Sequence, residues 1–271
     1  FFKIYISKNK DLFIGRRVID LPAGCGETSK ELMDLGADIH PYDLFPEYSF
    51  YPEIDCRKAD IGVGIPENDA SADVLICQEG IEHFSDQLRA LKEFNRVLKK
   101  GGLLIITTPN YSNIRSRLSY FLNETERYGS MMPPNEIDSV WMAAPEISNE
   151  LYCGHIFLIG IQKLRTLAKF AGFSIKRMVR TEVRPTSALL FPFVYPFIYL
   201  NAWMTYRKNL RKKSNVPFEI RKKVYSEQFK LAINRGILID GNLFVEFQKD
   251  IDSHEVINTL RGELRHFGNP T

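Results

Sequence analysis

One short stretch of the chain brings two carboxylates and an imidazole close together. Residues 78–83 read QEGIEH, an E-x-x-E-H pattern, and a second histidine, His155, follows later in the chain. Carboxylate and imidazole groups together can bind a divalent cation, and an imidazole can instead act as a general base toward a hydroxyl group. The stretch therefore predicts proton transfer or metal-assisted chemistry at an oxygen atom, with catalytic roles for Glu82, His83 and His155.

The neighbouring residues predict where this stretch lies in a fold. Ala72–Cys77 is a nearly continuous apolar run, which is typical of a parallel strand buried on both faces. Residues 86–100 carry apolar side chains at helical spacing and are followed by Gly101 and Gly102, which predicts a helix that ends at the glycines. Leu103–Thr107 is the next strand. Because open α/β sheets bind ligands beyond the carboxyl ends of their strands, the E-x-x-E-H stretch is expected at that edge.

A second candidate site follows the short apolar run that ends at Asp20. A turn with two glycines comes next, and a helix is expected from Ser29 to Leu35, with Thr28 or Ser29 as its N-cap. Glycines allow positive φ and a close approach by a ligand, and the free amides of a helix start favour an anionic or polar group. A dinucleotide-binding turn would have a third glycine at the position of Ser29, which weakens that alternative.

Two further acidic residues are expected near this turn. Ala37–Tyr42 is a predicted second strand, and Asp43 follows it. An acidic residue about 20 positions after a glycine turn is placed to bind ribose hydroxyls, although a turn role for Asp43 is the alternative. Asp55–Ile61, which includes Asp60, is the predicted third strand and its exit.

These landmarks resemble a known superfamily. The turn resembles the first motif of class I S-adenosylmethionine (SAM) dependent methyltransferases, acidic-x-Gly-x-Gly-x-Gly, with proline in place of the first glycine. Residues 99–110 (KKGGLLIITTPN) resemble the fifth strand region of the same superfamily. The resemblance implies an α/β fold with a Rossmann-like, seven-stranded, mostly parallel sheet, helices on both faces, and SAM as cofactor. It implies SAM-binding roles for Asp20, Pro22, Gly24, Gly26, Asp43, Asp60 and Gln78, with Asp43 on the ribose and Asp60 on the adenine amino group.

The E-x-x-E-H stretch is similar to that of metal-assisted O-methyltransferases, both the ubiquinone-pathway and the small-RNA 2′-O types. That similarity implies a site for Mg²⁺ or another divalent cation, with the ligands Glu79, Glu82, His83 and His155. A histidine that acts as a general base is one alternative. Many members of the superfamily carry an E-H pair without a metal, in which Glu caps the helix and His packs beside SAM, so a structural role is another. The resemblance extends from Val18 to Val183 and leaves the acceptor open.

The expected activity is transfer of a methyl group to a hydroxyl of a saccharide, lipid-linked or phenolic small-molecule acceptor. RNA 2′-O-methylation is one alternative, but a net charge of +3 and the lack of a recognisable RNA-binding module speak against a nucleic acid partner. A SAM-binding partner protein without catalysis is a second alternative, and the intact acidic and histidine residues argue against it.

The chain is expected to divide into three parts. Residues 1–183 form the SAM-binding core, in which 111–152 are a predicted lid and Phe173–Val183 are the sixth strand. Residues 184–241 form a helical insertion, and 242–271 supply the seventh strand and a C-terminal helix. Four side chains of the lid are candidates for lining a substrate pocket, with packing as the equal alternative: Met131, Met132, Trp141 and Met142.

The insertion has an unusual composition. Ala188–Trp203 is almost wholly apolar but contains two prolines, and basic residues follow it up to residue 213 and beyond. The apolar part is short and interrupted for a membrane span, whereas an apolar segment with basic neighbours can lie on an anionic membrane surface. Residues 188–213 therefore predict membrane-surface contact, and the alternative is a helical subdomain buried in the core or in a homodimer.

Composition gives weaker information. Hydrophobic residues make up 44% and charged residues 25% of the 271 residues, as in an ordinary globular protein. Four scattered cysteines without a C-x-x-C pair and no signal peptide at the start predict a reduced, cytoplasmic setting, with peripheral membrane contact as a variant of it. The chain does not begin with Met, which suggests that residues precede Phe1.

Overall fold

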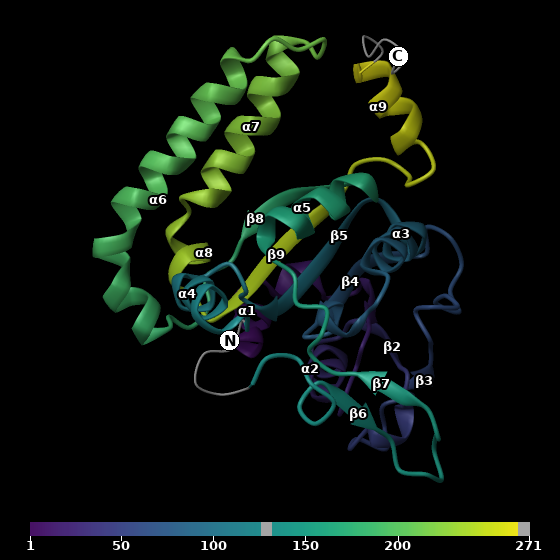
Figure 1. Ribbon diagram of the computed structural model, residues 1–271. Coiled ribbons are helices and arrows are strands. Elements are labelled where there is room, and N and C mark those ends of the chain that lie inside the picture. Colours follow the sequence, from purple (N-terminus) through teal and green to yellow (C-terminus); the bar gives the residue numbers. More distant parts are fainter. Residues whose placement is uncertain (126–131, 265–271) are drawn as a thin grey trace.

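A central seven-stranded sheet organises the part of the chain that the computed structural model describes, residues 1–125 and 132–264. The strand order is β3-β2-β1-β4-β5-β9-β8, parallel from β3 to β5, with β9 antiparallel to both of its neighbours (Figure 1). The bounds are β1 Arg17–Asp20, β2 Asp38–Asp43, β3 Arg57–Lys58, β4 Ala72–Gln78, β5 Leu98–Pro109, β8 Phe173–Met178 and β9 Asn242–Lys249. The predicted Rossmann-like fold is confirmed.

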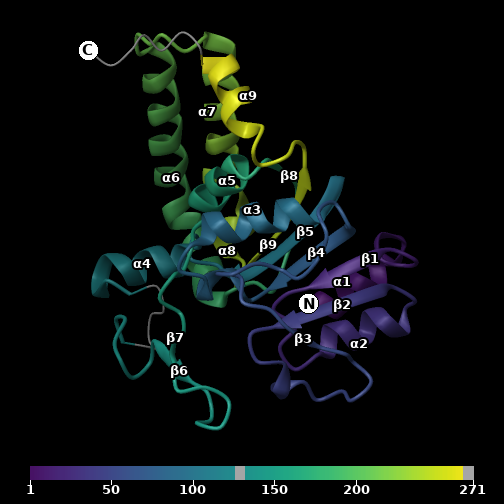
Figure 2. The same ribbon diagram turned by 90° about the vertical axis from the view of Figure 1, so that its right-hand side faces the viewer.

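Helices cover both faces of this sheet (Figure 2). Successive strand residues alternate between the two faces, so Ile19 packs in the cluster with helices α3 and α5, while Val18 packs in the cluster with α1 and α2. The helices of the core are α1 Phe2–Lys8, α2 Glu27–Asp34, α3 Gln87–Val97, α4 Ile114–Asn123 and α5 Ile161–Phe170. Helix α9, Val256–Leu264, follows the last strand and lies away from the sheet (Figures 1 and 2). The three-residue 3₁₀ helices are η1 Lys10–Leu12, η2 Pro46–Tyr48 and η3 Ile81–His83.

The helical insertion lies where the sequence predicts it, between the last two strands. It consists of α6 Pro185–Arg211, α7 Phe218–Ala232 and α8 Arg235–Ile239, and α6 and α7 project from the sheet as a hairpin (Figures 1 and 2). Helix α6 continues through Pro192 and Pro196. The two prolines are four residues apart and exposed, so the turns that lose a backbone hydrogen bond face away from the core.

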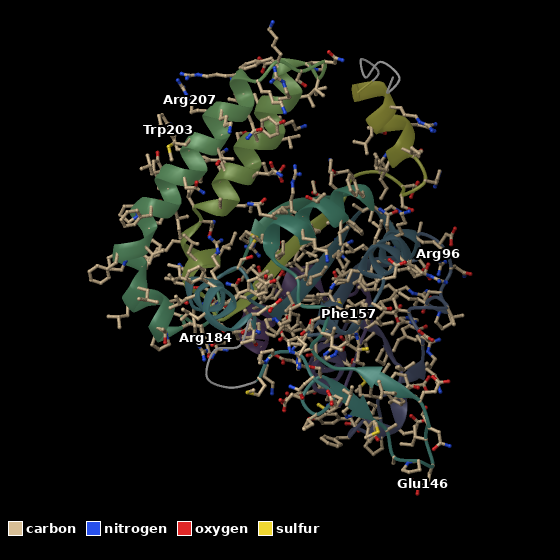
Figure 3. All side chains as sticks on the ribbon, in the orientation of Figure 1. Arg96, Glu146, Phe157, Arg184, Trp203 and Arg207 are labelled. Atoms are coloured by element: carbon tan, nitrogen blue, oxygen red, sulfur yellow. The ribbon has the colours of Figure 1, made fainter. Side chains whose placement is uncertain are left out.

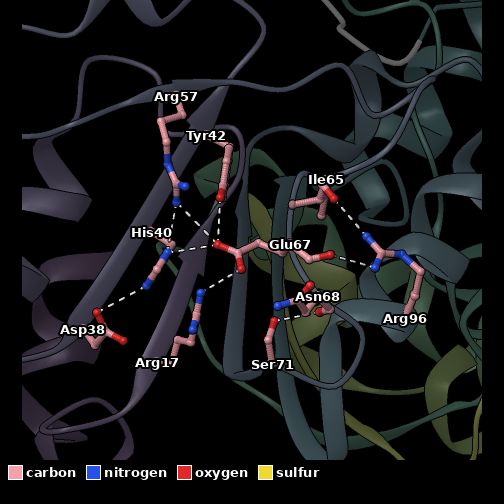
Figure 4. Close-up of polar contacts among 10 residues, drawn as sticks. All are labelled: Arg17, Asp38, His40, Tyr42, Arg57, Ile65, Glu67, Asn68, Ser71 and Arg96. Atoms are coloured by element: carbon pink, nitrogen blue, oxygen red, sulfur yellow. Dashed lines mark hydrogen bonds and ion pairs between the residues drawn. The ribbon is translucent and has the colours of Figure 1, made fainter.

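A buried carboxylate fixes the β2–β3 edge of the sheet. The Glu67 side chain, 5% exposed, accepts hydrogen bonds from Tyr42 and Arg17 at 2.7 Å each and lies 2.9 Å from Nδ1 of His40 (Figure 4). Burial opposes ionisation of Glu67, but the Tyr42 hydroxyl and the neighbouring cations lower the pKa of this carboxyl below its ordinary value. The network ties β1 to β2 and so holds the carboxyl end of β2 in place.

The helix before β5 ends earlier than predicted, at Val97, and the glycine pair lies inside the strand that follows. The cause lies far away in sequence. The buried Lys249 ammonium donates to the carbonyl oxygens of Asn95 and Leu98, at 2.7 and 2.9 Å, and satisfies the end of the helix without a glycine. Gly102 is needed for another reason, because a Cβ there would lie 2.7 Å from the Lys99 carbonyl oxygen.

Other predicted bounds also move. The third strand is limited to Arg57–Lys58, and the sixth ends at Met178, although Val183 still forms a bridge with Asp240. Helix α2 begins at Glu27, so Gly26 is its N-cap and the predicted caps are wrong. The hydroxyls of Thr28 and Ser29 instead bind side chains at the ends of two strands, Gln78 and Asp20.

The predicted lid contains regular structure. It includes α4 and a two-stranded hairpin of β6 Val140–Met142 and β7 Leu151–Cys153. The Trp141 ring lies 4.8 Å from that of Phe45, just after β2, whereas Met132 and Met142 are 71% and 70% exposed. Met131 lies outside the described residues.

Candidate active site

The glycine turn after β1 has the backbone that the sequence predicts. Gly24 and Gly26 have φ of +54° and +84°, in the left-handed region that favours glycine. The Gly24 amide donates to Oδ2 of Asp43 at 2.8 Å, so the end of β2 holds the turn. Ser49 approaches from the other side, with its Oγ 3.0 Å from the place a Cβ on Gly26 would occupy.

Asp43 and Asp60 are brought near each other. The Asp43 carbonyl accepts from the Ala59 amide at 2.9 Å, which places Asp60 in the turn directly beyond the end of β2. Asp60 is exposed and accepts from the Gly62 amide at 2.7 Å. Their expected contacts with ribose and adenine remain predictions.

Asp20 is 1% exposed at the end of β1 and accepts a hydrogen bond from Ser29 Oγ at 2.6 Å. The carboxylate therefore faces helix α2, and a direct contact with a ligand stays a prediction. Burial raises the pKa of Asp20 to about 7, the Ser29 hydrogen bond opposes the rise, and the charge of Asp43 adds to it. Gln78, at the end of β4, is also held by this helix, since its Oε1 accepts from Thr28 at 2.9 Å.

The buried carboxyl of Asp20 predicts a pH-dependent stability difference. Between its ordinary pKa of 3.8 and the folded value of about 7, the folded chain binds a proton that the unfolded chain does not. Stability from this group is therefore complete below about pH 4 and is lost as the pH rises through about 7. Asp20→Asn keeps an acceptor for Ser29 but cannot ionise. We therefore expect its free energy of unfolding to rise relative to that of the wild type between about pH 4 and about pH 7, by at most about 1.4 kcal/mol per pH unit, and the difference to level off above that range.

Thermal melting of the two proteins across that range measures this difference. The exposed Asp11 supplies the control, because Asp11→Asn removes a carboxylate with ordinary solvation. A difference in melting temperature between Asp20→Asn and the wild type that stays constant with pH would contradict the raised pKa of Asp20.

The glycine turn also contacts the E-x-x-E-H loop directly, a contact that sequence reasoning missed. A Cβ on Gly80 would lie 2.2 Å from Cδ and 2.7 Å from Cγ of Pro22. Neither atom belongs to a flexible side chain. The proline that replaces the first glycine of the motif thus fits against a glycine after β4, and the two loops fix each other.

Carboxylates gather around this edge of the sheet. Burial and the charges of Asp43, Asp20 and Asp55 together raise the pKa of the Cys56 thiol to about 12. The same negative potential favours a cationic ligand group, and the carboxylate oxygens suit ribose hydroxyls.

The second half of the E-x-x-E-H stretch forms a compact cluster with His155. One ligand atom each from Glu82, His83 and His155 lies within 4.8 Å of the others, and the two imidazole centroids are 5.0 Å apart. Glu82 is fully buried and accepts from Thr108 Oγ1 at 2.9 Å, while His83 is exposed, with Nδ1 3.4 Å from the Cys153 carbonyl oxygen. The sequence therefore identified residues that the fold brings together.

Gln87 joins the two segments that carry the histidines. Its Nε2 donates to the Ile81 carbonyl at 3.1 Å, beside His83, and to the Phe157 carbonyl at 2.7 Å, two residues after His155. Phe157 is partly exposed (Figure 3). No chemical signal in the sequence marks Gln87, because its role depends on a loop that is distant in the chain.

Glu79 is directed elsewhere and does not belong to this cluster. It has φ of +47°, unusual for a residue other than glycine, and its Oε1 accepts from Asn242 Nδ2 at 3.0 Å. It lines a cavity of about 440 Å³ together with Arg184 and Leu158. The other lining residues are Pro109, Asn110, Tyr111, Asn113, Arg115, Ser116, Gly241 and Asn242. Strained backbone beside a polar cavity is typical of functional sites.

Comparison with known proteins identifies the family of this chain. Residues 5–177 match the family model of a methyltransferase domain. The chain belongs to the class I SAM-dependent methyltransferases. Two ubiquinone biosynthesis O-methyltransferases are similar to it. The one from Xanthomonas oryzae pv. oryzae is 27% identical over 171 residues, which cover 56% of this chain and 71% of the relative. The one from Xanthomonas campestris pv. campestris is 26% identical over 161 residues, which cover 53% of this chain and 67% of the relative.

A solved structure of a SAM-dependent methyltransferase from Archaeoglobus fulgidus shares the fold, with a TM-score of 0.54 at 14% identity over 92% of this chain and 93% of that one. SAM is the methyl donor of this family, and the residues of this methyltransferase fit it. The turn leaves room for a ligand beside Gly24, where a Cβ would meet nothing within 4 Å, and Asp43 offers carboxylate oxygens next to it. Ser49 Oγ, buried and without a hydrogen-bond partner among the described residues, lies against Gly26 as a further polar group.

Proposed function

We propose that this methyltransferase transfers the SAM methyl group to a hydroxyl oxygen of a small-molecule acceptor, a phenol, saccharide or lipid-linked compound. The observation that carries the proposal is the cluster of Glu82, His83 and His155 at the sheet edge that follows β4. The names of the Xanthomonas relatives, which are O-methyltransferases, support the same reaction class.

The cluster supplies what an oxygen acceptor needs. Bound SAM provides an electrophilic methyl group on a sulfonium. A neutral hydroxyl is a weak nucleophile, and an imidazole that takes its proton as the new bond forms lowers the barrier. If His83 Nδ1 keeps its proton toward the Cys153 carbonyl, its Nε2 is free to accept one. The buried carboxylate of Glu82 then stabilises the imidazolium that results, as an acidic residue does in other acid–base groups.

The cavity beside Glu79 is the proposed acceptor site. Glu79 lies four residues before His83, and Leu158 three after His155, and both line it. Its polar wall can orient several hydroxyl groups, with acceptors and donors from Glu79, Asn242 and Arg184. Orientation of the reacting oxygen toward the methyl carbon accounts for a large part of such catalysis.

A divalent cation is a second proposal for the same cluster. One carboxylate and two imidazoles suit Mn²⁺, Fe²⁺ or Zn²⁺ better than Mg²⁺, which prefers oxygen ligands. Such an ion would lower the pKa of a bound hydroxyl. Glu79, the fourth ligand implied by the resemblance, bonds to Asn242 instead and would have to leave it. Calorimetric titration of Mn²⁺ into the wild type and His155→Ala tests the site independently of turnover.

Transfer of a labelled methyl group tests the reaction class. The purified protein is incubated with labelled SAM and with catechols, simple sugars, isoprenoid-linked phenols or a short RNA, and the products are analysed by mass spectrometry. We expect the label on an oxygen of one of the first three acceptors. Label on nitrogen or carbon would contradict the proposal, and so would SAM binding without transfer to any acceptor, which would favour a partner protein without catalysis.

A further inference from the structure

Helix α6 presents an apolar stripe that no described part of the chain covers. Its inner side chains, among them Phe191 and Tyr195, pack toward α4 and α8, and Tyr199 contacts Phe229 of α7. The outer side chains recur at intervals of three or four residues and therefore lie along one face. They are between 49% and 74% exposed: Leu189, Phe193, Phe197, Leu200 and Met204. We call these five residues the apolar stripe.

The stripe leads to a strongly basic tip. Between residues 207 and 223 there are eight Lys and Arg residues and a single acidic residue, Glu219. Arg221 has a structural role, since its guanidinium donates to carbonyl oxygens at the end of α6. The other seven form no ion pair with any described residue: Arg207, Lys208, Arg211, Lys212, Lys213, Lys222 and Lys223. This basic tip has an excess of positive charge that nothing in the described chain neutralises.

Trp203 lies at the border between these two surfaces. Its side chain is 43% exposed and points outward from α6 (Figure 3). The Arg207 guanidinium lies over its ring, 5.7 Å from the ring centroid. An open groove at the tip is lined by Trp203, Met204 and basic residues that include Arg211. Amphipathic aromatic rings beside Lys and Arg are typical of the boundary between acyl chains and headgroups.

We propose that the α6–α7 hairpin docks the methyltransferase onto an anionic phospholipid bilayer, with the apolar stripe among the acyl chains and the basic tip on the headgroup phosphates. The positive charge of the basic tip complements the anionic headgroups, which favours a bilayer over a second copy of the chain. Two hairpins packed in parallel would bring two basic tips together. Among the described residues α6 is the one helix long and apolar enough to cross a membrane. Surface docking is favoured over a span because α7, which packs on α6, carries Lys222, Glu227 and Lys230.

Vesicle co-sedimentation of the full chain tests the proposal. The vesicles contain phosphatidylcholine with or without phosphatidylglycerol. We expect the wild type to pellet with the phosphatidylglycerol vesicles and to be released by high salt, because the headgroup contacts are electrostatic. Phe193→Asn/Phe197→Asn and Lys212→Glu/Lys213→Glu should each bind at least about tenfold more weakly, while SAM binding and circular dichroism remain those of the wild type.

A matched variant separates the stripe from exposed apolar side chains in general. Ile4→Asn/Ile137→Asn changes two residues that are 60% and 84% exposed outside the hairpin, and it should bind vesicles like the wild type. Failure of the wild type to pellet with either vesicle, or equal weakening in this control, would overturn the proposal. A lipid-free dimer in light scattering that Phe193→Asn/Phe197→Asn converts to a monomer would also overturn it, because a second copy would then cover the stripe.

Discussion

The double variant His83→Ala/His155→Ala is expected to bind SAM like the wild type and to transfer methyl groups roughly 10²- to 10⁴-fold more slowly. Both imidazoles belong to the cluster with Glu82, whereas the contacts expected to hold SAM are those of the glycine turn and Asp43. Removal of the bases should therefore affect the chemical step rather than cofactor binding. The measurement is the rate of label transfer at saturating SAM, with an acceptor found in the panel, beside a calorimetric titration of SAM.

Single variants refine this result. If one imidazole takes the proton and the other only packs against it, His83→Ala and His155→Ala should differ by at least about tenfold in rate. His254→Ala is the control, because that histidine is exposed and lies just before α9. A double variant that retains the wild-type rate would contradict a role of the cluster in proton transfer.

Gly80→Ala is expected to destabilise the fold by about 2–3 kcal/mol, the usual cost of overpacking at a rigid site. The new Cβ would lie 2.2 Å from Cδ of Pro22, so the loops after β1 and β4 must separate. In thermal unfolding this corresponds to a fall of the melting temperature by roughly 5–10 °C. We also expect weaker SAM binding, because the same movement displaces the glycine turn.

A second substitution tests whether the Pro22 ring is the cause. Pro22→Gly removes the two closest atoms and restores the glycine of the superfamily motif, so Gly80→Ala should cost much less in this background. Gly262→Ala on α9, where a Cβ would meet nothing within 4 Å, is the control. Additive effects of the two substitutions would contradict the proposed contact.

The parts of the fold that depend on local pattern could be predicted from the sequence. Ala72–Cys77 is a strand because a nearly continuous apolar run is buried on both faces of a sheet. The residues before Asp43 also predict a strand, and Asp43 is the last residue of that strand, β2. The glycine turn follows from the need for positive φ. The grouping of Glu82 with His83 could be expected from their place after β4, and the proximity of His155 came from family resemblance.

The features that depend on distant residues could not be predicted. The end of α3 is set by Lys249, more than a hundred residues later, so the glycine pair, which predicts the end of a helix, lies inside β5 instead. Glu79 lies outside the cluster because its positive φ turns the chain and because Asn242 Nδ2 donates a hydrogen bond to its carboxylate. The fit of Pro22 against Gly80 is likewise visible only when the two loops are seen together.

Calorimetric titration of SAM into the wild type, Asp43→Ala and Asp38→Ala tests the central assignment most directly. Asp38 and Asp43 are the first and last residues of the same strand, so the pair compares the two ends of β2. We expect SAM to bind the wild type and Asp38→Ala with similar affinity. Asp43→Ala should bind at least about tenfold more weakly, because it loses charged hydrogen bonds to the ligand and to the Gly24 amide. Equal binding by all three proteins, or none by the wild type, would contradict a SAM site formed by the glycine turn and the end of β2.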